Sequence, residues 1–213
     1  FAGTSFNSRV GGFTITGSGG AGVELNPGFH SNTFIENNVL TAGGADGVYA
    51  NGTIGSLTIT GNRIGGNARS GVRMENAVNF KGGSVVANNT IGLDAAGNAA
   101  QPNAGQGIIF LGGRDGSAIN NTIGGNGFYG VVVTGAAAGT TITGNRIGVG
   151  TDGTTAIGNG QSGVFVLGGA IGTKITGNTI RNNNGMAGIQ VVDGTSSTTI
   201  GGSGSSANLL VNN

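Results

Sequence analysis

The sequence contains no cysteine, and only two of its 213 residues are proline, Pro27 and Pro102. Without cysteine, neither a disulfide nor a thiolate metal site can hold the fold together. Glycine is abundant, with 49 residues, but it has no Gly-x-y period, so the composition excludes collagen and a proline-rich linker. Backbone hydrogen bonds and a packed apolar core must therefore stabilise the fold.

Charged residues are also scarce, and nine Lys or Arg nearly balance eight Asp or Glu. This balance leaves no basic stripe for nucleic acid and no polybasic patch for a membrane surface. No apolar run approaches ~20 residues, which excludes a transmembrane helix. His30 is the only histidine, which argues against zinc or copper. We therefore expect no metal, cofactor or nucleic acid and no membrane insertion, and leave open a single calcium in a loop.

A repeated tetrapeptide dominates the sequence that is present. Each copy is a glycine followed by Val or Ile and a short apolar alternation, and successive copies lie 23 to 36 residues apart. This period is typical of solenoids. The copies begin at Gly22, Gly47, Gly71, Gly107, Gly130, Gly163 and Gly188.

Asparagine marks two further positions in each period. One set precedes an aliphatic residue by two, and the other lies five residues before the aliphatic residue of the tetrapeptide. Repeated asparagines at bends are expected to stack as structural hydrogen-bonding ladders rather than to bind a ligand. The first set is Asn38, Asn62, Asn89, Asn121, Asn145 and Asn178, and the second is Asn67, Asn103, Asn126, Asn159 and Asn184.

These markers divide each period into three short strands separated by turns. Each strand would pair in parallel with its counterpart one turn away, and alternation would point Val23, Val48, Val72 and their equivalents inward. The markers, together with the stretch 89–98, resemble the right-handed parallel β-helix repeat family, the pectin-lyase-like superfamily of secreted bacterial proteins. The resemblance covers nearly the whole chain. It implies an all-β fold, a right-handed single-stranded parallel β-helix (β-solenoid) of about seven to eight turns of three short strands, in an extracellular or cell-surface protein.

The unequal spacings have one explanation. Two of the connections between the first asparagine marker and the next tetrapeptide, from Ile91 to Ile108 and from Ile147 to Val164, are longer than the others. We therefore predict a single β-helix domain over 1–213, with loop insertions at about 92–106 and 148–162 that leave the rod at one corner. Insertions on one side of a solenoid often build its working face, and solvated hairpins are the plainer alternative.

The outward position next to each inward valine forms a column with two halves. Its apolar half, Ile109, Val132 and Phe165, would form an exposed strip. Cover by the inserted loops, lateral self-association and a ligand platform all remain open for this strip.

The polar half, Glu24, Tyr49 and Arg73, offers the candidate catalytic residues, with Asp46, Glu75 and His30 in reach. The resemblance to β-helix lyases implies proton abstraction beside a uronate carboxylate, with Tyr49 or Arg73 acting on the substrate. However, the sequence lacks the clustered aspartates of the calcium-dependent lyases, the paired carboxylates expected of a hydrolase and the Asp-Pro-His segment of alginate epimerases. These absences favour a non-catalytic role.

Three interpretations of function result. The first is a non-catalytic extracellular structural or adhesive module, which assembles end to end into fibres or belongs to a longer surface protein, because neither end of the solenoid looks capped. The second is a polysaccharide lyase or hydrolase, or a carbohydrate-binding β-helix. The third is ice binding, favoured by Thr-Ile-Thr runs such as 58–60 and 141–143, although Lys174 and Phe34 interrupt the threonine array.

Overall fold

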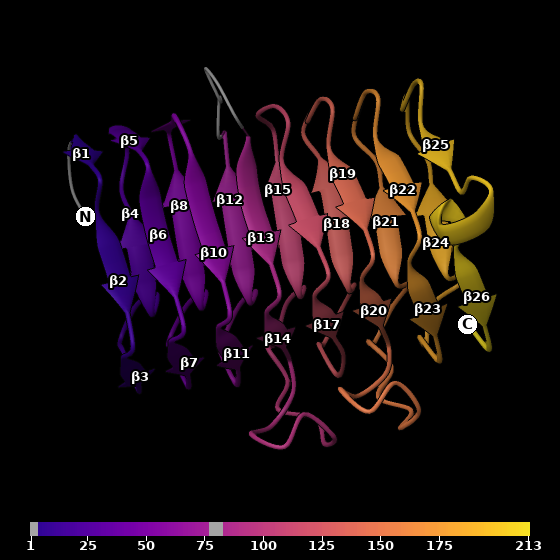
Figure 1. The fold of residues 1–213 in the computed structure, drawn as a ribbon, viewed down its shortest axis with the longest axis horizontal. Coiled ribbons are helices and arrows are strands. Elements are labelled where there is room, and N and C mark those ends of the chain that lie inside the picture. The colour runs from indigo at the N-terminus through magenta and orange to yellow at the C-terminus, as the bar shows by residue number, and fades with distance from the viewer. Residues whose placement is uncertain (1–3, 77–82) are drawn as a thin grey trace.

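The computed structural model describes residues 4–76 and 83–213 and shows an elongated coil of short strands (Figure 1). Residues 1–3 and 77–82, which the predicted domain includes, lie outside the described part of the chain. Three long parallel sheets run along the coil, with eight, eight and seven strands. The paired strands are parallel throughout, as the sequence predicts.

We number the sheets by their first strand in the chain. Sheet 1 contains β2 (Arg9–Gly11), β6 (Thr33–Glu36), β10 (Leu57–Thr60), β13 (Ser84–Ala87), β16 (Ser117–Ile119), β19 (Thr141–Thr143), β22 (Lys174–Thr176) and β25 (Thr199–Ile200). Sheet 2 contains β3 (Thr14–Thr16), β7 (Val39–Thr41), β11 (Arg63–Gly65), β14 (Thr90–Ile91), β17 (Thr122–Ile123), β20 (Arg146–Ile147), β23 (Thr179–Arg181) and β26 (Leu209–Val211). Sheet 3 contains β4 (Val23–Leu25), β8 (Val48–Asn51), β12 (Val72–Glu75), β15 (Ile108–Leu111), β18 (Val131–Thr134), β21 (Val164–Val166) and β24 (Ile189–Val191).

The corner between sheets 3 and 1 differs from a simple three-strand turn. A small parallel sheet of β1 (Ser5–Phe6), β5 (Phe29–Ser31) and β9 (Thr53–Ile54) lies there in the first turns. In later turns the same corner is held by single bridges through Arg114, Ala138, Ile171 and Ser196. At a different corner, between β25 and β26, the last turn contains a 3-10 helix, η1 (Gly204–Ser206). The two-residue pairing at the corner between sheets 3 and 1 is too short to show as a period-2 pattern in the sequence.

The core consists of aliphatic columns that run along the coil axis. In sheet 3, Val48, Val72 and Ile108 are successive register partners, and all three are fully buried. In sheet 2, Ile64, Ile91 and Ile123 stack in the same way. β-Branched side chains suit this arrangement because they pack well on a pleated surface. The inward column starting at Val23 is therefore placed as the sequence predicts.

The first set of asparagines forms a continuous hydrogen-bonded ladder inside the coil. The backbone N–H and Nδ2 of Asn89 both donate to Oδ1 of Asn121, each over 3.0 Å, and Nδ2 also donates to the carbonyl of Ile59. The same pattern repeats from turn to turn, which confirms the predicted ladder. The ladder runs through Asn38, Asn62, Asn89, Asn121, Asn145, Asn178 and finally Asn208.

A second ladder joins Asn67, Asn103, Asn126 and Asn159, but it continues through Asn183 rather than the predicted Asn184. Nδ2 of Asn159 donates to Oδ1 of Asn183 over 2.8 Å, whereas Asn184 is exposed. Asn183 lies six residues before Ile189, whereas Asn159 lies five residues before Val164. Counting five residues back from Ile189 therefore selects the wrong asparagine. The ladder then reaches Asn213.

Phe13 occupies the place of the ladder asparagine in the first turn. Its backbone N–H donates to Oδ1 of Asn38 over 3.0 Å, as the N–H of an asparagine does in later turns. Its side chain is 57% exposed and offers neither donor nor acceptor. The side-chain ladder therefore begins at Asn38.

Two loops leave sheet 2, after β14 and after β20, and project from the coil together (Figure 1). An antiparallel bridge closes each loop, Leu93 with Ala100 and Val149 with Ala156. The loops also contact one another, because the backbone N–H of Thr151 donates to the carbonyl of Gly97. Each loop thus braces the other.

The glycine of the repeated tetrapeptide is explained by close packing between turns. A Cβ placed on Gly130 would lie 2.6 Å from the carbonyl oxygen of Gly163 and 2.6 Å from Cγ2 of Ile147. Real Cβ atoms essentially never approach other heavy atoms this closely. Gly71 and Gly107 meet the same two kinds of neighbour in their own turns. Glycine therefore recurs here because the next turn leaves no room for a Cβ, and not because the backbone is left-handed.

Candidate functional site

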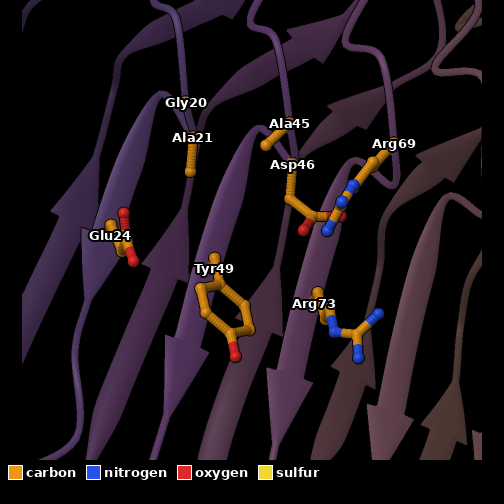
Figure 2. Close-up of a pocket in the computed structure, with 8 residues that line it drawn as sticks. All are labelled: Gly20, Ala21, Glu24, Ala45, Asp46, Tyr49, Arg69 and Arg73. Atoms are coloured by element: carbon orange, nitrogen blue, oxygen red, sulfur yellow. The ribbon is translucent and has the colours of Figure 1, made fainter.

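The polar half of the outward column lies on three neighbouring strands of sheet 3. Glu24 on β4, Tyr49 on β8 and Arg73 on β12 are successive register partners. Figure 2 shows their side chains on one surface, with Asp46 and Arg69 on the turns that lead into β8 and β12. The structure thus brings the three predicted residues together.

Tyr49 and Arg73 are tied to one another through Glu75. The Tyr49 hydroxyl donates to Oε2 of Glu75 over 3.0 Å. Nε and Nη2 of Arg73 donate to the same oxygen over 3.1 and 3.0 Å, and the Arg73 guanidinium carbon lies 5.9 Å from the centre of the Tyr49 ring. Burial, together with the neighbouring Glu75 carboxylate, raises the pKa of Tyr49 above its ordinary value of 10. Tyr49 is therefore a neutral hydrogen-bond donor near pH 7.

Asp46 is the buried acid of the site, with only 3% of its surface exposed. Its Oδ1 accepts a hydrogen bond from the backbone N–H of Ser70 over 2.8 Å. Burial raises the pKa of Asp46, and the Ser70 hydrogen bond and the charges of Arg73 and Arg69 only partly oppose this effect. Asp46 therefore takes up a proton at a higher pH than an exposed aspartate does.

Two adjoining hollows lie over these residues. The first has a volume of about 230 Å³ and extends from Gly20 and Glu24 to Tyr49. The second has a volume of about 310 Å³ and extends to Gln106 and Phe128. Both hollows are lined by Asp46, Arg69 and Arg73. We call the combined depression the groove; it follows the coil axis across several turns.

Of the three further residues that the sequence places near this site, two lie at it and one lies elsewhere. Asp46 and Glu75 contribute to it, whereas His30 does not. Nδ1 of His30 is 2.7 Å from the Ser5 hydroxyl, and Nε2 is 2.8 Å from the carbonyl of Asn26. His30 is fully buried in the small sheet and is bonded at both ring nitrogens.

Sequence reasoning missed Arg69 and Phe128 as groove residues. They occupy the same corner position, since the N–H of Gly105 donates to the Arg69 carbonyl and the N–H of Phe128 donates to the Gly105 carbonyl. In the sequence this position lies two residues before the repeated glycine. Comparing the residues at that position from turn to turn, in addition to the outward strand residues, identifies both.

The prediction that the apolar strip is exposed is wrong for two of its three residues. Ile109 and Val132 are only 9% and 4% exposed, and Phe165 is half-buried with its ring stacked on Tyr129 at a centroid distance of 4.6 Å. The three residues are register partners on adjacent strands. Side chains of directly opposite residues on one sheet face lie close enough to cover one another. Two of the three residues of the strip are therefore buried rather than exposed.

Within residues 4–76 and 83–213, no group of three or more His, Asp or Glu side chains is arranged to hold a metal ion. In the same described part of the chain, no helix is long and apolar enough to span a membrane.

The sequence profile described as "Right handed beta helix region" matches residues 3–147. Among curated proteins, no sequence matches the chain. Among solved structures, the fold is similar to the A-module of a mannuronan C-5 epimerase from Azotobacter vinelandii, with a TM-score of 0.59 and 22% sequence identity. The similarity covers 97% of this chain but only 54% of that module. On the evidence of the profile match and the parallel coil, the chain belongs to the right-handed β-helix family.

Proposed function

We propose that the chain is a non-catalytic, extracellular adhesive β-helix module that binds a polysaccharide chain along the groove. The observation that carries the proposal is the pair of adjoining hollows that share Asp46, Arg69 and Arg73. A depression that follows the coil axis suits a linear polymer better than a compact ligand. The epimerase module that shares the fold acts, by its name, on the polysaccharide mannuronan.

The groove offers the kinds of group that recognise sugars. Phe128 is 50% exposed at one end and Tyr49 is partly exposed near the other, so each offers an aromatic face to a sugar ring. Between them, the Arg69 guanidinium makes no hydrogen bond or ion pair with any residue in the described ranges. Arginine suits a carboxylate because its planar group donates two parallel hydrogen bonds. A uronate-containing polymer is thus the ligand class that fits best.

The protonation states of the groove support binding without catalysis. Tyr49 is not available as the base for proton abstraction, because its raised pKa keeps the hydroxyl protonated near neutral pH. The only imidazole of the sequence, His30, is buried elsewhere. Arg73 already donates two hydrogen bonds to Glu75, which restricts it as a neutralising cation for a substrate. These features agree with the absence of lyase and hydrolase signatures in the sequence.

End-to-end fibre assembly has weaker support than glycan binding. In a stack that continued the first asparagine ladder in register, the donors of Asn208 in one copy would face Phe13 of the next. Phe13 offers no side-chain acceptor, whereas each internal turn offers an asparagine Oδ1. An amide left unpaired at such a junction would cost about 1–3 kcal/mol.

Substitution of Arg69 tests the groove. We expect Arg69→Ala to weaken the binding of a galacturonic acid hexamer about tenfold, because a charged hydrogen bond contributes about 1.5–3 kcal/mol. Isothermal titration calorimetry measures this change. Lys174→Ala, which removes an exposed cation from sheet 1, is the matched control and should leave the affinity unchanged. Equal losses in both variants would show that binding depends on net charge and not on the groove.

A further inference from the structure

The groove contains an acid that is poorly placed for a site that binds a carboxylate. Asp46 is almost completely buried, lines both hollows and lies in the electrostatic field of both arginines. We propose that Asp46 is a charge gate: when ionised, its negative charge repels the carboxylate of a uronate bound at Arg69 and Arg73, and its protonation removes that repulsion. This inference rests on the proposed function.

The gate depends on how the charged groups face Asp46. Arg69, from the turn before β12, and Arg73, on β12, both attract its carboxylate. Glu24 on β4 and Tyr49 on β8 line the same hollow. Glu75 on β12 is held by Arg73 and the Tyr49 hydroxyl.

The charge balance of the site explains why one proton matters. With Asp46 ionised, three carboxylates (Glu24, Asp46 and Glu75) accompany two guanidinium groups. With Asp46 protonated, two carboxylates balance the two cations. Because the groove is partly shielded from water, one unit of charge has a larger effect on a nearby anion there than at an open surface.

A neutral Asp46 also remains well accommodated. Its Oδ1 can keep the hydrogen bond from the Ser70 N–H in either protonation state, so the turn has no need to move. The gate is therefore electrostatic rather than conformational.

The sign of the pH dependence follows from the direction of the shift. Burial raises the pKa of Asp46 above 3.8, whereas the carboxyl group of a uronate titrates at about 3.5, near the value of an α-carboxyl group. As the pH falls from 7 through the raised pKa, Asp46 takes up its proton before the ligand does. Affinity for the acid should increase over this window, and by linkage the binding should take up a proton.

The experiment measures the binding of the galacturonic acid hexamer and of its methyl ester by calorimetry between about pH 7 and pH 4.5, in buffers of different ionisation enthalpy. For the wild type we expect the acid to bind progressively more tightly as the pH falls, by up to about fivefold, with proton uptake, and no change for the uncharged ester. Asp46→Asn keeps the shape and the acceptor for Ser70, so it should bind the acid tightly at both pH values, without proton uptake. Asp193→Asn removes an acid outside the groove and should behave as the wild type.

Three results would overturn the gate. The first is an Asp46→Asn variant whose binding has the same pH dependence as that of the wild type. The second is binding of the ester without any binding of the acid, a result that would still support a glycan site in the groove. If neither ligand binds, the proposed function fails, and the Asp46 side-chain carboxyl carbon is then titrated by NMR on the free protein. A midpoint at or below 3.8 in that titration would refute the gate independently of any ligand.

Discussion

Replacing Asn121 by alanine should lower the free energy of unfolding by about 4 kcal/mol, the largest effect that we expect from a single polar substitution in this protein. Asn121 is 1% exposed, and its Oδ1 accepts hydrogen bonds from both the backbone N–H and Nδ2 of Asn89. Its Nδ2 donates to Oδ1 of Asn145 and to the carbonyl of Val86. Alanine would leave the backbone N–H and Nδ2 of Asn89 without their Oδ1 acceptor, and would remove the hydrogen bonds to Asn145 and Val86, in a place that water does not reach. Urea denaturation followed by circular dichroism measures the loss.

The adjacent residue provides a matched control. Asn120 is exposed and has a positive φ of 53°, so glycine can take its place without backbone strain. We expect Asn120→Gly to change the stability by no more than about 0.5 kcal/mol. If Asn121→Ala were as mild as Asn120→Gly, the buried ladder would not be a main source of stability.

The second large effect concerns the repeated glycine. Gly130→Ala should destabilise the protein by about 3 kcal/mol, because the added methyl group would overlap the Gly163 carbonyl and Cγ2 of Ile147. Neither neighbour can yield easily, since the carbonyl belongs to the next turn and Ile147 belongs to the buried column of sheet 2. Thermal unfolding monitored by calorimetry measures the change.

Gly19→Ala separates this steric effect from a general preference for glycine. A Cβ at Gly19 meets nothing within 4 Å, and the residue has no positive φ. We expect this variant to be neutral or slightly more stable, because alanine reduces the conformational entropy of the unfolded chain. Similar losses at both positions would contradict the packing explanation of the repeat.

The sequence is informative about the fold because each inward column depends on a local rule that every turn repeats. Val48, Val72 and Ile108 fall in register because strand alternation and the glycine marker recur together. The first asparagine ladder is predictable for the same reason. The prediction of Asn184 fails where one extra residue enters a turn, because a fixed offset cannot detect such an insertion.

The groove is harder to predict, because it combines a strand column with a corner column. Glu24, Tyr49 and Arg73 follow from alternation along sheet 3. Arg69 and Phe128 lie on turns, where no period-2 rule says which way a side chain points. The burial of Ile109 was missed because exposure depends on neighbouring turns and not on the strand alone.

The central claim, that the groove binds a polysaccharide and leaves it unchanged, is tested most directly by saturation-transfer NMR on the galacturonic acid hexamer mixed with the protein. One sample reports both binding and chemistry, because sugar protons in contact with the protein gain intensity and any product gives new resonances. We predict saturation transfer to sugar protons in the wild type, a marked loss of it in Arg69→Ala, and an unchanged sugar spectrum after prolonged incubation. New resonances from an unsaturated, shortened or epimerised product would show that the module is an enzyme, and an absence of saturation transfer would show that the groove is not a site for this class of glycan.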